Sequence, residues 1–315
     1  MLDLLGGLSA YLVFFAVIAL YYALVTLGLN LQWGFTGLFN VGVAGFVLVG
    51  AYTTGILTTP DDPGRIGGFG LPVPVGMLGA MLMAGFFALL VGIPALRLRH
   101  DYLAITTFGI AVTLQLLALN LQVLTGGPFG MNFIPRPFQD TLGSGQAWNI
   151  LYLLFVAILV LLVWRGFAAL TDSPWGRVLR AIREDETAAS ALGKHAFRFR
   201  LEAFVIGAMV MGLAGAVYAH FIGFVAPEDF LPILTFQVWA MLVVGGSGSH
   251  KGAITGAVLV WAIWTGSGAL LDQLVPPESK AQAAALQVAA IGMALCIVLL
   301  FRPQGLLGAR TRGSV

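Results

Sequence analysis

Eight long apolar runs set the strongest limit on how this chain folds. Each run is close to the roughly 20 residues that an α-helix needs to cross a hydrocarbon core about 30 Å thick. Hydrophobic residues make up 59 % of the 315 residues and charged residues only 10 %, so there are too few charges to cover a soluble fold of this size. The sequence therefore predicts an all-α, polytopic membrane protein, with runs at 10–29, 35–57, 73–96, 102–123, 148–165, 203–224, 253–271 and 283–301.

A ninth apolar run, Leu234–Gly246, is shorter than an ordinary span, and the basic residues indicate whether it crosses. With the N-terminus outside and nine crossings, 13 of the 16 Lys and Arg residues lie inside and 3 outside, which is a strong positive-inside bias. If this run only dipped and returned, Lys251 and three C-terminal arginines would move outside and weaken the bias. We therefore expect about nine transmembrane helices, in a range of about eight to ten, and a cytoplasmic C-terminus.

The segments between the runs are too short for a soluble domain. The largest are 126–147, expected outside, and a cytoplasmic loop at about 166–202, so residues 1–315 are predicted to form a single transmembrane domain. No basic residue precedes Arg65, so the first run lacks the basic region of a signal peptide and is expected to be a retained helix. The single cysteine, Cys296, permits no intrachain disulfide and no thiolate metal site.

The cytoplasmic loop holds the clearest local pattern. Ser173 and Pro174 supply an N-cap and a proline at the first helical position, and Gly193 is placed to end the helix. Apolar residues recur between them at helical spacing, with a solvated acidic run at Glu184–Glu186. One interpretation is a helix lying on the lipid interface. The other is a docking helix for a cytoplasmic partner, which small residues favour because they permit close packing.

The start of the second run is unusually polar and rich in glycine. Buried amides and hydroxyls in lipid need partners or water, which a broken helix beside an aqueous pathway would supply; simple hydrogen bonding between helices is the alternative. We predict substrate-pathway residues here first, and next in the fourth run, where Thr113, Gln115 and Asn120 are weaker candidates. The predicted set is Asn30, Gln32, Thr36, Asn40, Thr106 and Thr107.

Small residues at four-residue intervals predict close helix packing in two places. These are Gly248, Gly252 and Gly256, and Ala208, Gly212 and Ala216. The glycine-rich stretch from Gly245 does not have the spacing of a phosphate-binding loop. His220 lies near the outer end of its run and is expected at the membrane interface.

Several motifs resemble one family of bacterial importers. Asp185-Glu-Thr-Ala-Ala-Ser-Ala-Leu-Gly193 resembles the EAA loop of ABC importer permeases, and other stretches resemble the LivM-type permeases of branched-chain amino acid uptake. The likeness covers about residues 25 to 308, with departures at Asn40, where serine is expected, and at His250-Lys251. The other matching stretches are Leu29–Gly42, Gly50–Thr53, Arg97–Thr106, Leu242–Ser249 and Phe301–Gly308.

The resemblance implies an ABC importer permease fold and a permease subunit that forms half of a pathway for branched-chain, hydrophobic amino acids. ATP and Mg would bind to two cytoplasmic ABC ATPase subunits, so that this chain needs no cofactor or metal of its own. The other implied partners are a second permease of the LivH type, an extracytoplasmic substrate-binding protein and the lipid of the bacterial inner membrane. The residues implied to couple to the ATPase are Glu186, Ala188, Ala189, Leu192 and Gly193.

Other functions remain open or are disfavoured by the sequence. Urea, short amides or other amino acids are alternative cargoes within the family. A self-contained secondary transporter is disfavoured because the centres of the runs hold essentially no carboxylates or histidines. A membrane enzyme is disfavoured because no Ser/His/Asp, Cys/His or metal-ligand set converges on one side, so no catalytic residue is assigned. The net charge of +2 gives no argument for nucleic-acid binding.

Overall fold

The computed structural model describes residues 2–61, 64–98, 100–139, 145–276, 279–301 and 304–308. Arg99, Arg302, Arg310 and Arg312, which enter the count of inner basic residues, lie outside these ranges. Within the described ranges the regular structure is helical, and extended pairing is confined to an isolated bridge between Met131 and Val225. The all-α prediction is confirmed.

The long helices carry most of the apolar runs. They are α1 (Leu2–Leu29), α3 (Val73–Ala95), α4 (His100–Asn120), α7 (Gln146–Asp172), α10 (Ala196–Ile222), α12 (His250–Leu274) and α13 (Lys280–Phe301). The shorter helices are α2 (Val43–Thr58), α5 (Gln122–Thr125), α8 (Pro174–Glu184), α9 (Glu186–Ala191) and α11 (Pro232–Gly245). A π-helical turn occupies Asn30–Phe35, and 3-10 turns occupy Gly127–Phe129 and Pro227–Phe230.

Six helices of the described chain are long and apolar enough to cross a membrane by length and composition. The apolar helices α2 and α11 have 16 and 14 residues and are shorter than an ordinary span, so the expected number of about nine crossings is not confirmed. The qualifying segments are Ala10–Gly34, Val73–Ala95, Asp101–Asn120, Gln146–Asp172, Ala196–Ile222 and His250–Leu271.

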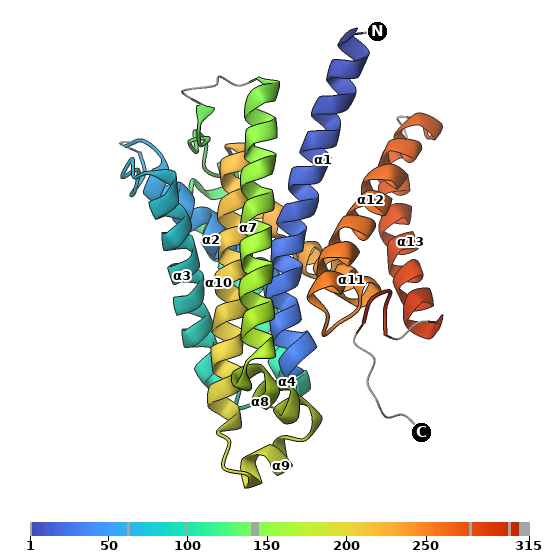
Figure 1. Cartoon of the computed structure of the whole chain (residues 1–315). Coiled ribbons are helices and arrows are strands. Elements are labelled where there is room, and N and C mark those ends of the chain that lie inside the picture. The colour runs from blue at the N-terminus through green and yellow to red at the C-terminus, as the bar shows by residue number, and fades with distance from the viewer. Residues whose placement is uncertain are drawn as a thin grey trace.

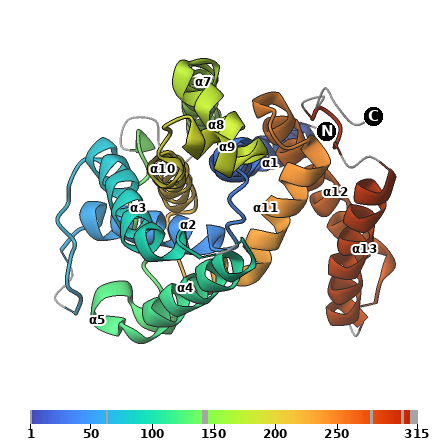
Figure 2. The same ribbon diagram turned by 90° about the horizontal axis from the view of Figure 1, so that it is seen from below.

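Helix α10 lies at the centre of the fold and packs against α1, α2 and α3 (Figure 2). Small residues allow this close approach: a Cβ atom on Gly28 of α1 would lie 2.6 Å from the carbonyl oxygen of Gly207 of α10. The predicted small face at Ala208, Gly212 and Ala216 is buried in this packing. Gly252 and Gly256 of α12 likewise pack against Gly245 of α11. Gly248 instead precedes α12 with a φ of +80° and donates its N–H to Asn30 Oδ1. The face at Ala208, Gly212 and Ala216 is therefore a packing surface as predicted, and the second face holds for Gly252 and Gly256 only.

Charged residues gather at the end of the molecule that holds α8 and α9. The start of α1 lies at the end opposite to α8 and α9 (Figure 1), and these two short helices carry three arginines and three acidic residues within Arg177–Glu186. Helices α12 and α13 form a pair at one edge (Figures 1 and 2). This arrangement matches the predicted placement of the N-terminus and the 166–202 loop on opposite sides; the orientation in a membrane stays a prediction.

Two local expectations need correction. The helical segment predicted from Ser173 to Gly193 is two helices, because Asp185 has extended backbone angles and its side chain caps α9 by accepting a hydrogen bond from Ala188 N at 2.9 Å. His220 is fully buried rather than at the interface. Its imidazole lies 2.8 Å from Thr54 Oγ1 and 2.7 Å from the carbonyl oxygen of Pro135, so it connects α2, α10 and the outer loop.

Candidate functional site

Residues 30–42 interrupt the helical path between α1 and α2. The segment starts with the π-helical turn and continues through an irregular stretch, in which Gly37 has a φ of +72° that favours glycine. The hydroxyl of Thr36 donates to the carbonyl oxygen of Gln32, which also accepts from Leu38 N at 3.0 Å. Gly34 has no room for a side chain, because a Cβ atom there would overlap Asn30 and the backbone of Gly248. π-Turns of this kind are frequent at functional sites.

The polar residues of this broken segment bond to one another and to α10. Gln32 Nε2 donates to the carbonyl oxygen of Phe204 at 2.8 Å, and Gln32 Oε1 accepts from Asn40 Nδ2 at 2.7 Å. Asn40 Oδ1 in turn accepts from Gly42 N at 2.8 Å. Gln32, Thr36 and Asn40 have no exposed surface. Their hydrogen-bond partners are therefore protein atoms, as in the alternative of simple hydrogen bonding between helices. Their place on a substrate pathway stays a prediction.

Asn30 ties the same segment to the start of α12. Its Oδ1 accepts from Gly248 N at 2.8 Å and its Nδ2 lies 3.3 Å from His250 Nδ1. The other ring nitrogen of His250 lies 3.0 Å from Thr171 Oγ1 at the end of α7, and the imidazole stacks on Phe35 with ring centroids 4.8 Å apart. His250 thus joins the π-helical turn, α7 and α12, a role that its position in the glycine-rich stretch did not reveal.

The second predicted group lies on α4. Thr107 is buried, and its hydroxyl accepts from Val41 N at 3.0 Å while donating to α4 carbonyl oxygens. Thr106 is half-buried, and Thr113 and Asn120 are exposed. The structure therefore brings Thr107, but not the rest of the α4 set, to the broken segment.

Two aromatic residues of the broken segment, Trp33 and Phe39, face a groove instead of the buried polar cluster. Trp33 and Phe39 line an open groove of about 700 Å³, together with Trp239 of α11. The Trp239 indole donates to the carbonyl oxygen of Asn40 at 2.9 Å, which fixes the ring against the segment. Sequence reasoning missed these residues because it followed the amides and hydroxyls; the alternation of large aromatic and polar residues between Asn30 and Asn40 was the available signal.

The predicted coupling residues divide between an inner and an outer face of α9. Ala189 is buried, with 4 % of its surface exposed, against Ile182 and Ala196, so it does not lie on a free docking face as expected. Ala188 and Gly193 are exposed, and Leu192 is 81 % exposed. Gly193 has a φ of +79° directly after α9 and follows the end of that helix, as predicted. The available face is therefore Ala188, Leu192 and Gly193.

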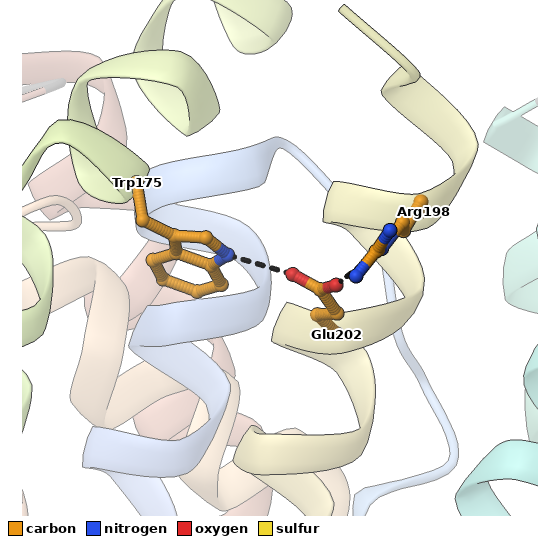
Figure 3. Close-up of polar contacts among 3 residues, drawn as sticks. All are labelled: Trp175, Arg198 and Glu202. Atoms are coloured by element: carbon orange, nitrogen blue, oxygen red, sulfur yellow. Dashed lines mark hydrogen bonds and ion pairs between the residues drawn. The ribbon is translucent and has the colours of Figure 1, made fainter.

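Three contacts hold the two short helices against the membrane-spanning part. The Trp175 indole of α8 donates to Glu202 Oε2 of α10 at 2.8 Å, and Glu202 Oε1 accepts from Arg198 at 2.9 Å (Figure 3). Glu186 of α9 pairs with Arg200 of α10 at 2.6 Å. The guanidinium of Arg183 donates to the carbonyl oxygen of Gly34 in the π-turn. A force on α8 or α9 therefore reaches both α10 and the broken segment.

The described residues hold no group of three or more His, Cys, Asp or Glu side chains that could bind a metal ion. Gly245–Gly252 forms the junction of α11 and α12, in which Ser249 Oγ accepts from Gly252 N at 3.1 Å as the cap of α12. This geometry serves helix packing.

Comparison with known proteins identifies relatives along most of the chain. The family model described as the permease component of the branched-chain amino acid transport system matches residues 11–300. The high-affinity branched-chain amino acid transport system permease protein LivM of Escherichia coli is 34 % identical over 314 residues, which cover 93 % of this chain and 69 % of that protein.

More distant relatives also match much of the chain. The LivH permease protein of the corresponding system in Salmonella typhimurium is 26 % identical, over 91 % of each chain. The guanosine ABC transporter permease protein NupQ of Bacillus subtilis is 26 % identical, over 67 % of each chain. No solved structure matches the chain.

Proposed function

The chain belongs to the family of permease components of branched-chain amino acid transport systems, and from this membership we propose that it carries branched-chain, hydrophobic amino acids across the bacterial inner membrane. The observation that carries the proposal is the family match over residues 11–300. As a permease component of an ABC importer, the chain forms half of the translocation pathway in this proposal. Its C-terminus and the 166–202 loop lie in the cytoplasm.

The remaining components supply the energy and the cargo. Two cytoplasmic ATPases bind and hydrolyse ATP with Mg, while a LivH-type permease completes the pathway and an extracytoplasmic binding protein delivers the amino acid. This division is supported by the spacing at Gly245–Gly252, which is not that of a nucleotide loop. The chain contributes transport and coupling without an ATPase site or cofactor of its own.

In this proposal the coupling runs through the exposed face of α9. Ala188 and Gly193 let an ATPase surface approach closely, and Leu192 supplies an apolar side chain for a pocket on that surface. Glu186 and Arg200 hold α9 to α10, so that motion of the ATPase turns or shifts α10. Ala189 supports the helix from behind through its contact with Ile182.

The broken segment 30–42 borders the pathway in this proposal. Asn30, Gln32, Thr36, Asn40 and Thr107 keep the irregular backbone in place, and Thr106 precedes Thr107 on α4. Rearrangement of these bonds during transport would expose the segment to water. Water-soluble thiol reagents should then label Thr36→Cys and Asn40→Cys in a Cys296→Ser background in at least one nucleotide state. Protection in every state would restrict these residues to bonding between helices.

Reconstitution tests the cargo and the energy source together. The assembled importer in proteoliposomes should accumulate leucine, isoleucine and valine only when ATP is inside the vesicles and the binding protein is outside. Guanosine and urea serve as comparison cargoes. Accumulation driven by a sodium or proton gradient without ATP would contradict the proposal and favour a secondary transporter. ATP-driven uptake of guanosine or urea alone would keep the permease assignment and overturn the cargo.

A further inference from the structure

The groove beside the broken segment has the composition of a small-molecule site. Its volume is about 700 Å³, within the range of ligand pockets, which are mostly apolar with a few placed polar groups. Trp33, Phe39 and Trp239 pack edge to face or tilted, with ring centroids 4.8 to 5.4 Å apart. These three rings form an aromatic wall that comes from two elements, the broken segment and α11.

The groove contains a positively charged side chain and a polar amide, which a surface that faces only lipid would not need. Arg183 of α8 and Gln237 of α11 contribute to the lining, and the described lining residues include no carboxylate. Arg183 is fixed by its bond to Gly34, and Gln237 Oε1 accepts from the Tyr22 hydroxyl at 3.1 Å. The groove therefore presents one guanidinium, one oriented amide and the hydroxyl residue Ser247 among mostly apolar side chains, which matches a small apolar molecule that carries a carboxylate.

We propose that this groove binds the cargo, a hydrophobic α-amino acid, during its passage. The aliphatic side chain lies against Trp33, Phe39 and Trp239, and the α-carboxylate meets the guanidinium of Arg183. The ammonium group lies over the indole faces and near Gln237 Oε1, which keeps a second lone pair. This inference rests on the proposed function and deepens it by assigning the site.

The position of Arg183 connects this site to the docking helices. Arg183 lies in the last turn of α8, two residues before the cap of α9, and its partner Gly34 follows Trp33 directly. A displacement of α8 and α9 therefore moves the ligand of the carboxylate and the aromatic wall together. The groove is thus the part of the chain where an ATPase-driven movement changes the contacts of the cargo.

Filling the groove tests the assignment. Gly292 of α13 lines it, and a Cβ atom there meets no other atom within 4 Å, so Gly292→Leu adds a four-carbon side chain at a lining position with open space at its Cβ. Gly266→Leu on α12 is the matched control, because Gly266 has equal space and lies outside the lining. In the assembled importer in proteoliposomes, initial ATP-driven uptake of leucine and of alanine is measured with the binding protein loaded with each.

Gly292→Leu should lower leucine uptake about tenfold and alanine uptake much less, while Gly266→Leu leaves the ratio of the two rates at the wild-type value. An unchanged ratio in Gly292→Leu overturns the site. Failure of the second permease to co-purify with Gly292→Leu, but not with Gly266→Leu, also overturns it and makes the groove an interface between permeases. If the wild-type importer accumulates no hydrophobic amino acid, the proposed function itself fails. That result is distinct from a failure of the site, which is judged only from variants of an active wild-type importer.

Arg183 separates binding of the carboxylate from a purely structural role. Arg183→Gln should lower leucine uptake about tenfold, and Arg183→Lys should restore part of it, because an ammonium still pairs with a carboxylate. Both variants keep an N–H donor for the carbonyl oxygen of Gly34, so a purely structural Arg183 predicts equal uptake in the two. Equal uptake in Arg183→Gln and Arg183→Lys would show that Arg183 only holds α8 to the π-turn, and would overturn its role as the carboxylate ligand.

Discussion

The broken segment 30–42 and the paired helices α8–α9 differ in which kind of residue they bury. In the segment, the side-chain amides of Asn30, Gln32 and Asn40 are fully buried and bonded to protein atoms. In α9, small and apolar residues such as Ala188 and Leu192 are left exposed. A buried polar group without a hydrogen-bond partner lowers the stability of the fold, whereas an exposed apolar surface is typical of a binding site for another molecule. Substitutions should therefore damage folding in the first region and coupling in the second.

The largest expected effect is the loss of coupling in Leu192→Asp. Burying an unpaired carboxylate in an interface costs about 3–5 kcal/mol, so ATP hydrolysis stimulated by the binding protein should fall at least roughly 100-fold. Ile66→Asp is the control, because Ile66 is similarly exposed, at 64 %, in the loop before α3. The free energy of unfolding of the permease should not change. Normal stimulation in Leu192→Asp would show that α9 meets only water or lipid headgroups.

Gln32→Leu should give the next largest effect, and on stability rather than coupling. It leaves the amide nitrogen of Asn40 without its partner and removes the side-chain donor to the carbonyl oxygen of Phe204, at a cost of about 1–3 kcal/mol for the stranded buried amide. Reversible unfolding in mixed detergent micelles measures the change. Gln115→Leu on α4, where the side chain is half-buried, is the control with an expected change near zero. Equal stability of the two variants would mean that water, not protein, satisfies the segment.

A smaller effect is expected at Trp175, where α8 is attached to α10. Trp175→Phe keeps the ring but removes the donor to Glu202 (Figure 3), which should lower the free energy of unfolding by about 0.5–1.5 kcal/mol. Arg198→Gln removes the other partner of Glu202, an exposed one with 77 % of its side chain accessible, and should change less. A larger loss of stability in Arg198→Gln than in Trp175→Phe would show that the Arg198–Glu202 ion pair matters more than the bond from Trp175.

The smallest effect concerns a half-buried carboxylate between α10 and α11. Burial raises the pKa of Asp229 above its ordinary value, against the lowering effect of the bond from Ala226 N. A raised folded-state pKa favours the protonated form, so this contribution to stability is present below the unfolded pKa and is lost as pH rises through the folded pKa. Asp229→Asn should flatten the pH dependence of unfolding in that window, and Glu228→Gln should not. An unchanged profile in Asp229→Asn would contradict the burial argument.

Much of the architecture and the family was predictable from local features. Apolar runs of about 20 residues fix membrane helices because lipid allows only structures that satisfy their own backbone. Ser173 and Pro174 predicted the start of α8, and the structure confirms this start: Ser173 Oγ accepts a hydrogen bond from Trp175 N. Four-residue spacing of small residues predicted the faces at Gly252 and Ala208. The short runs were ambiguous, because length alone does not tell a full span from α2 or α11.

The sequence by itself determined that the chain is a membrane permease, which residues are polar within its apolar runs, and where α8 starts. The tertiary structure decided which way those residues face. Lipid tails and a protein interior are equally apolar, so hydropathy does not tell a lipid-facing residue from one buried between helices. Periodicity likewise places Ala189 and Leu192 on one helix without telling which meets Ile182. Only non-local packing turned Gln32 toward α10 and Trp33 toward the groove.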